Sequence, residues 1–430
     1  MKENFIKSTF ILLIGGAITK LLGMIIKIIM SRLIGTEGLG LYMLILPTFS
    51  LFIGLSQFGM PVALSKLVSE NKKNNIKLLF SILPISLCVN IFLMLSIFLF
   101  APILSNNLLH NKESYLGIIS VAFVIPFTSI SSICRSYFFG KEKMFPHVFS
   151  NIFEDLIRLL LMMFGIPFFI NFSIDVVVCF IILSNIISEL ASIVILILFL
   201  PKKVCIKRSD LRPKKTYMME SLSIGIPNTA SRLVGSFGYF LEPIILSSIL
   251  TKIGYSSKWI TLEYGVLSGY VMPLLLLPSF FTLAISQALL PVVSREYSHG
   301  NKLLVSRKIK QAISISLIIG IPITICFLIF PAFFLKLIYH TTEGVNYMRV
   351  LAPVCLLQYI QAPLSNSLEA MGKSKEAFLG TFFGVIVRTS LLFLLSFFKI
   401  GLWGLIIAIS LNVLIVTLYD IVKVNNSLKY

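Results

Sequence analysis

The chain of 430 residues is 57% hydrophobic and 13% charged, with a mean hydropathy of +0.95. This composition excludes an ordinary soluble globular protein, and apolar runs of about 20 residues recur along the chain. We therefore expect an all-α polytopic membrane protein. The net charge of +19 would suit a nucleic-acid partner if it formed one patch, but its distribution indicates membrane topology instead, with no nucleic-acid partner.

The apolar runs and the basic residues between them define a topology. We count twelve spans, centred near residues 19, 53, 89, 126, 159, 187, 235, 278, 319, 359, 387 and 411. With a cytoplasmic N-terminus, 25 of the 37 Lys and Arg residues fall on the inner side and six on the outer side. This bias predicts a multi-pass plasma-membrane protein with both termini in the cytoplasm, whose inner loops contact membrane lipids. The first run is too long for a cleaved signal peptide and remains a span.

The first span carries two lysines at membrane depth. Gly16, Lys20, Gly23 and Lys27 follow one another at steps of four, three and four residues, which places them on one face of a helix. A lysine inside a membrane costs several kcal/mol unless it faces water, a partner or the interior of a bundle. Lys27 could also extend to the outer interface. Lys20 lies about halfway along the span, so we expect it to face a substrate cavity.

Span five carries Glu154, Asp155 and Arg158, and span six carries Glu189. Glu154 and Arg158 stand at i and i+4 in the favourable order, so one reading is a pair that neutralises itself and only holds the helix in place. We interpret these residues, together with Arg388 in span eleven, as charges that support the cavity. Arg388 has no acid four residues earlier, and Glu189 is one candidate partner for it.

The second half of the chain repeats the first. At an offset of 212, Lys20 corresponds to Arg232 and Lys27 to Tyr239, and further matches follow at offsets of 229 to 232, including Arg158 with Arg388. The change of offset locates about 18 extra residues near 250–264. We therefore expect a six-helix lobe at 1–200, a basic cytoplasmic linker at 201–215 and a second six-helix lobe at 216–430.

Two copies with an even number of spans enter the membrane in the same orientation, so their symmetry axis should lie along the membrane normal. The first helix of each lobe would then bring its basic residue to the shared interface. Glu242 follows Arg232 by ten residues and would flank it on the helix. The predicted substrate-binding residues are Lys20, Lys27, Arg232, Tyr239 and Glu242.

The sequence contains no element that we assign to an enzyme, a metal site or a cofactor. Its six cysteines have no CxxC spacing, and its four histidines are scattered. The segment MGKS at 371–374 resembles the end of a phosphate-binding loop, but Ser367 stands where the leading glycine would be. We expect a transporter with no cofactor, driven by an ion gradient, the membrane potential or the substrate's own concentration difference.

Four blocks of sequence resemble the stage V sporulation protein B-like polysaccharide-exporter family. They are TKLLGMIIKIIMSRLIGTEGLGLYMLILP (19–47), SQFGMPVALSKLVSE (56–70), CRSYFFGKEKMFPHVFSNIFEDLIR (134–158) and IGIPNTASRLVGSFGYFLEPII (224–245). This family belongs to the multidrug/oligosaccharidyl-lipid/polysaccharide flippase superfamily and is related to the lipid II flippases. The resemblance implies a two-lobed fold, transport of a lipid-linked glycan such as a peptidoglycan precursor for the spore cortex, and cell-wall synthesis enzymes as partners.

Two other functions fit parts of the sequence. A multidrug/cation antiporter of the same fold needs an acidic residue in the cavity of the first lobe, but no Asp or Glu occurs between Glu3 and Glu37. A scaffold for a wall-synthesis complex would bind the glycan without moving it. We favour a flippase, because cationic side chains in a cavity suit an anionic lipid diphosphate.

Overall fold

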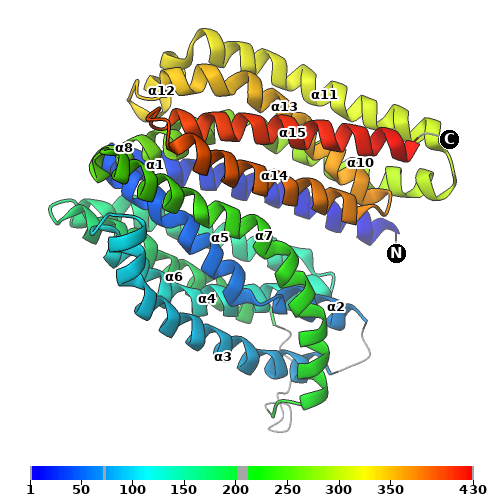
Figure 1. Ribbon diagram of the computed structural model, residues 1–430. Coiled ribbons are helices and arrows are strands. Elements are labelled where there is room, and N and C mark those ends of the chain that lie inside the picture. The colour runs from blue at the N-terminus through cyan, green and yellow to red at the C-terminus, as the bar shows by residue number, and fades with distance from the viewer. Residues whose placement is uncertain (1, 71–73, 201–211, 429–430) are drawn as a thin grey trace. The chain divides into compact units, whose positions relative to one another are not determined.

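The computed structural model describes residues 2–70, 74–200 and 212–428, and its regular structure in these ranges is entirely helical (Figure 1). The helices of the first half are α1 (Lys2–Gln57), α2 (Met60–Ser69), α3 (Asn75–Pro102), the π-helical turn η1 (Ile103–Leu108), α4 (Ser114–Gly140), α5 (Met144–Phe169) and α6 (Ile174–Leu198). Next come α7 (Lys215–Ile253), α8 (Ser257–Gly265), the π-helical turn η2 (Val266–Val271), α9 (Met272–Leu275) and α10 (Ser279–Ser298). The last are α11 (Lys302–Ile329), α12 (Pro331–Tyr339), α13 (Val345–Ala370), α14 (Ser374–Ser396) and α15 (Trp403–Leu428).

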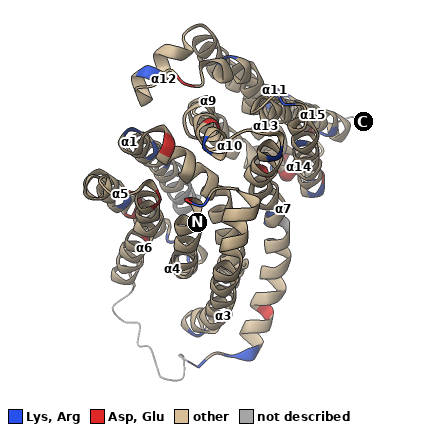
Figure 2. Cartoon of the chain, turned by 60° about the vertical axis from the view of Figure 1, so that its left-hand side comes forward, with Lys and Arg blue, Asp and Glu red and all other residues tan. Residues whose placement is uncertain are grey.

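These helices confirm an all-α membrane protein and account for twelve spans. Eight helical stretches of the described residues are long and apolar enough to cross a membrane, and the bent pair made by α8–α9 and α10 is a ninth if it forms a single span. The stretch Ile14–Ser69 has 56 residues, about 84 Å of helix, and therefore holds two spans, which meet where the helical backbone breaks at Gly35. Helices α5 and α13 lie at the two remaining predicted spans, centred near residues 159 and 359. Charged residues are sparse along all of these helices (Figure 2).

The chain packs as two compact units, Met1–Phe240 and Leu241–Tyr430, which divide within α7. The first part of α7 therefore packs with the first half of the chain. The lobe boundary at the 201–215 linker, drawn from the sequence repeat, remains a prediction, and residues 201–211 lie outside the described ranges.

The internal repeat is visible in how each unit packs. In the first unit α4 contacts α1, α2, α3 and α6, and α5 lies against α6. In the second unit α13 contacts α10, α11 and α15, and α14 lies against α15. Residues that the repeat matches at an offset of about 230 thus lie on helices with corresponding contacts in the two units. The extra residues near 250–264 form the end of α7, a short loop and most of α8.

A close backbone contact fixes α7 against the start of α2. Gly59 has a left-handed backbone with φ of 63°, and a Cβ atom added to it would lie 2.2 Å from the carbonyl oxygen of Gly225. Only glycine permits this approach, because any side chain would overlap the facing backbone. Farther along, a Cβ atom added to Gly54 in α1 would lie 3.8 Å from Ser236 Oγ. Arg232 lies on α7 between these two contacts.

Candidate functional site

The predicted cationic stripe is an uncovered face of the first unit. Lys20 is exposed on α1, and a Cβ atom added to the neighbouring Gly16 or Gly23 would meet no atom within 4 Å. Lys27 is partly buried one turn beyond Gly23. The glycines remove side chains that would flank Lys20, so an incoming group can approach its ammonium closely.

The corresponding face of α7 has the same character. Arg232 is exposed, and Gly235 beside it has open space around its Cα atom. Tyr239, the counterpart of Lys27, is partly buried. Lys20 and Arg232, which the repeat places at equivalent positions, are therefore both accessible on helices of the first unit. A cavity between the two lobes remains a prediction.

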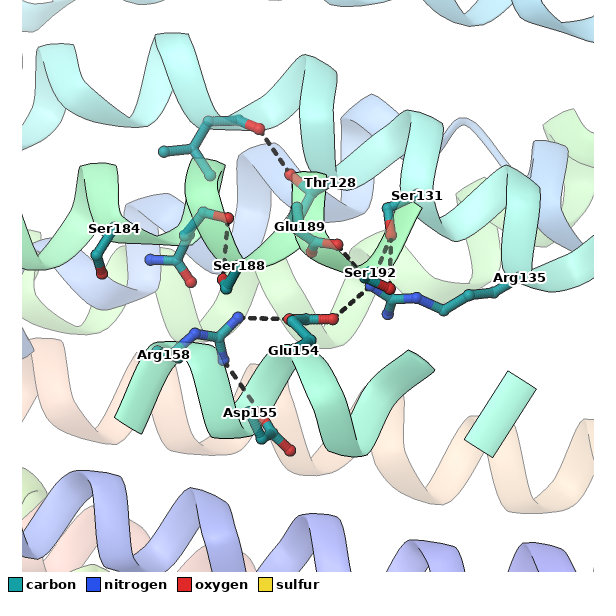
Figure 3. Close-up of polar contacts among 12 residues, drawn as sticks. Thr128, Ser131, Arg135, Glu154, Asp155, Arg158, Ser184, Ser188, Glu189 and Ser192 are labelled. Carbon is teal, nitrogen blue, oxygen red and sulfur yellow. Dashed lines mark hydrogen bonds and ion pairs between the residues drawn. The ribbon is translucent and has the colours of Figure 1, made fainter. Parts of the chain in front are cut away.

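A group of buried and partly buried charged side chains joins α4, α5 and α6 (Figure 3), and we call it the first-unit charge cluster. Arg135 of α4 binds Glu154 of α5 and, with Nη2 to Oε2 at 2.5 Å, Glu189 of α6. Arg158 donates to the other oxygen of Glu154 at 2.5 Å and lies 3.5 Å from Asp155. Two guanidinium groups thus face three carboxylates, in a place where unpaired charges would be very costly.

Arg135 connects this cluster to a cavity of about 420 Å³. Lys66 and His147 also line the cavity, together with serine hydroxyl groups, Asn151 and a few apolar side chains. Ser131 accepts a hydrogen bond from Arg135 Nη2 at 2.6 Å. The arrangement can hold three helices in a fixed register and present basic side chains to the cavity.

The sequence singles out four of the five residues of this cluster but predicts only one of its contacts. The Glu154–Arg158 pair forms as its i, i+4 spacing indicated. The sequence does not single out Arg135, because it lies near the predicted cytoplasmic end of its span, where topology alone accounts for a basic residue. The signal that could have found it is the excess of acids, since Glu154, Asp155 and Glu189 together need more than one cation.

The second unit pairs Arg388 with Glu242 and not with Glu189, which corrects the partner suggested from sequence. Glu189 is engaged by Arg135, whereas Glu242 reaches Arg388 from α7 and also accepts a hydrogen bond from the Tyr264 hydroxyl at 3.2 Å. Glu242 is only 4% exposed. Its carboxylate therefore links α7 to α14, and its role in substrate binding remains a prediction.

Groups that commonly bind metals are dispersed. Within the described residues, no three His, Cys, Asp or Glu side chains gather where they could hold a metal ion. The described cysteines are free thiols.

Comparisons with known proteins agree with this architecture. Residues 5–297 match the family model described as polysaccharide biosynthesis protein, and residues 267–394 match the MatE model. Stage V sporulation protein B of Bacillus subtilis (strain 168) is 32% identical over 99% of this chain and 85% of its own length. Lipid II flippase MurJ of the same strain is 23% identical over 90% of this chain and 76% of its own length.

Solved structures share the fold. An inward-facing multidrug resistance MATE family transporter of the MOP superfamily aligns with a TM-score of 0.72 and 16% identity, over 95% of both chains. The MATE multidrug transporter DinF-BH aligns with a TM-score of 0.68 and 18% identity, over 99% of this chain and 96% of its own. At these identities the likeness establishes fold alone. The family match and the relative at 32% identity establish that the chain belongs to the polysaccharide biosynthesis protein family.

Proposed function

We propose that the chain is a flippase that moves a lipid-linked oligosaccharide from the inner to the outer leaflet of the plasma membrane by alternating access. Its substrate would be a cell-wall or polysaccharide precursor, such as a peptidoglycan precursor used in sporulation. Family membership and the relatives named as a sporulation protein and a lipid II flippase support this assignment. On this proposal the chain is a transporter and not an enzyme.

The observation that carries the proposal is the exposed pair of cations at equivalent repeat positions. Lys20 and Arg232 lie on helices long and apolar enough to span a membrane, where lipid would penalise a free charge by several kcal/mol. A diphosphate carries the negative charge that would balance Lys20 and Arg232. Hydrogen bonds between ionised partners are about twice as strong as those between neutral partners. Lys27 and Tyr239 extend the same two faces.

A multidrug/cation antiporter is the second candidate, favoured by the shared MATE fold. Such a transporter needs an acidic residue that is free to exchange an ion in the first lobe. Glu154 and Glu189 are the buried acids among the described residues of the first unit, and arginines engage both of them. The pairing therefore favours the flippase for this unit.

The test is a flipping assay in reconstituted vesicles with a panel of lipid-linked sugars. Protein-dependent movement of a lipid diphosphate oligosaccharide, absent with neutral lipids of the same chain length, is the expected result. Movement of organic cations in exchange for protons or sodium would support the antiporter instead. Tight binding of the glycan lipid without movement would support a scaffold in a complex with wall-synthesis enzymes.

A further inference from the structure

One buried carboxylate of the second unit has no ion pair with any residue that the structure describes. Asp420 of α15 is 1% exposed. Its Oδ2 atom accepts a hydrogen bond from the Ser365 hydroxyl of α13 at 2.5 Å, and its Oδ1 atom is buried without a hydrogen-bond partner. No ion pair to Asp420 occurs among residues 2–70, 74–200 and 212–428. An ionised carboxylate in this environment would be strongly destabilising.

The internal repeat identifies the residue that replaces a cation beside Asp420. Arg135 of α4 holds Glu189 of α6 in the first unit. The residue 230 positions after Arg135 is Ser365, and the residue 231 positions after Glu189 is Asp420. The contact between α4 and α6 thus recurs between α13 and α15, with a hydroxyl in place of the guanidinium. The second unit therefore has the acid of this contact but not its cation.

Other charged groups on the surrounding helices do not replace that cation. Glu376 of α14 pairs with Lys423 of α15 at 2.7 Å, so these two charges cancel. Glu369 lies exposed near the end of α13, and Lys308 of α11 donates to Gln311 at 3.3 Å. Helix α14 approaches Asp420 at Gly380, where an added Cβ atom would lie 3.1 Å from Asp420 Oδ1, so the part of α14 at this contact carries no charge.

We propose that Asp420 is a proton-binding site of the second unit, protonated while buried and able to release its proton to the cytoplasm when the contact between α13 and α15 opens. A proton fits better than a metal ion, because Asp420 and Ser365 together offer too few oxygen ligands for sodium. Lys423 lies one turn nearer the predicted cytoplasmic end of α15, which makes the inner surface the closer source of protons. The site would add a proton-dependent step to the proposed flippase.

Infrared spectroscopy of the purified protein tests the site without any substrate. Wild type should show the carbonyl band of a protonated carboxylic acid, and the band should disappear at high pH. Asp420→Asn should remove it, whereas Glu376→Gln, which changes an accessible acid of the same helix layer, should leave it. Ser365→Arg rebuilds the first-unit arrangement and should also remove the band, because a guanidinium holds the carboxylate ionised. An Asp420→Asn spectrum identical to wild type would overturn the proposal.

Two further measurements keep the result interpretable. Asp420→Asn should unfold at nearly the wild-type temperature, since it replaces one neutral group by another of similar size. If that variant does not fold, Ser365→Ala decides: loss of its hydrogen bond must shift the carbonyl band, and an unshifted band refutes the assignment. Stabilisation of wild type by sodium that is lost in Asp420→Asn would also refute it, in favour of a cation.

A transport assay can also test the site, but this test rests on the proposed function. In vesicles the wild-type rate should change with internal pH, and Asp420→Asn should lose this dependence while still binding the lipid-linked sugar. An equal pH response in both proteins would exclude a role for Asp420 in transport. If wild type moves no lipid at all, the proposed function fails, while the infrared result stands on its own.

Discussion

Glu154 lies between the guanidinium groups of Arg135 and Arg158. The acids of the first-unit charge cluster therefore differ in which arginine neutralises them. Arg135 is the guanidinium that reaches Glu189, whereas Glu154 retains Arg158 if Arg135 is removed. A buried acid that loses its partner destabilises a protein far more than a neutral replacement of the acid does. The cluster therefore offers a direct measurement of charge pairing inside a membrane protein.

We expect Arg135→Met to lower the free energy of unfolding by about 3–5 kcal/mol, because Glu189 is left buried and unpaired. Glu189→Gln should cost much less, since Arg135 keeps Glu154. Adding Glu189→Gln to Arg135→Met should restore part of the lost stability. Thermal or denaturant unfolding in detergent measures all three. Additive effects of the two substitutions would show that Arg135 and Glu189 are not coupled.

Lys20→Ala and Arg232→Ala should each abolish or strongly reduce transport without loss of folding or membrane insertion. Both side chains are exposed, so neither is needed for packing, and each supplies a charge that the substrate would bind. Initial flipping rates in vesicles measure the effect. Lys375→Ala, at an exposed basic residue near the start of α14, is the matched control and should transport normally. Wild-type rates in the Lys20→Ala, Arg232→Ala double variant would reject the substrate assignment.

Sequence spacing could predict contacts within a helix but not between helices. Glu154 and Arg158 are four residues apart, so helix geometry alone joins them. Arg135 and Glu189 are 54 residues apart, and Arg388 and Glu242 are 146 apart, so only the packing of helices decides these pairs. The exposure of Lys20 could be predicted because glycines at helical spacing flank it.

At the scale of helices, the contact between Gly59 and Gly225 gives a packing prediction. Gly59→Ala should lower the free energy of unfolding by about 1–3 kcal/mol, because the new methyl group would overlap the Gly225 carbonyl. The positive φ of Gly59 adds strain. Gly235→Ala meets open space in α7 and should be neutral or stabilise the protein by about 0.5 kcal/mol. Equal unfolding temperatures for the two variants would contradict this packing.

The predicted spans correspond to helices, but their breaks were not all foreseen. Apolar length and the repeat placed each predicted span centre on a helix or, at residue 278, at the break between α9 and α10. The sequence did not predict that α8–α9 and α10 meet at a bend of 51°. It likewise placed the extra residues near 250–264 without predicting that they extend helices.

For the whole molecule, the charge bias predicts both termini in the cytoplasm. In a protein whose native cysteines are replaced by serine, Asn107→Cys and Ser257→Cys should react with a membrane-impermeant thiol reagent added outside intact cells. Ser209→Cys, in the linker and outside the described residues, should react only after permeabilisation. Labelling of the linker position in intact cells would reverse the assigned orientation.

The membrane potential should drive at least part of the transport cycle. A diphosphate with about two negative charges is favoured to leave an inside-negative cell by roughly 5 kcal/mol per 100 mV, at about 2.3 kcal/mol per charge. After release, Lys20, Lys27 and Arg232 would leave the predicted binding site positive, and the same field would draw these charges back toward the cytoplasm. One field therefore assists both strokes, provided that the charges move with the helices that carry them. Potassium diffusion potentials of either sign, imposed on vesicles with equal pH and sodium on both sides, should give faster initial flipping when the side that supplies the lipid is negative. Equal rates at both polarities would exclude this mechanism and leave coupling to an ion gradient.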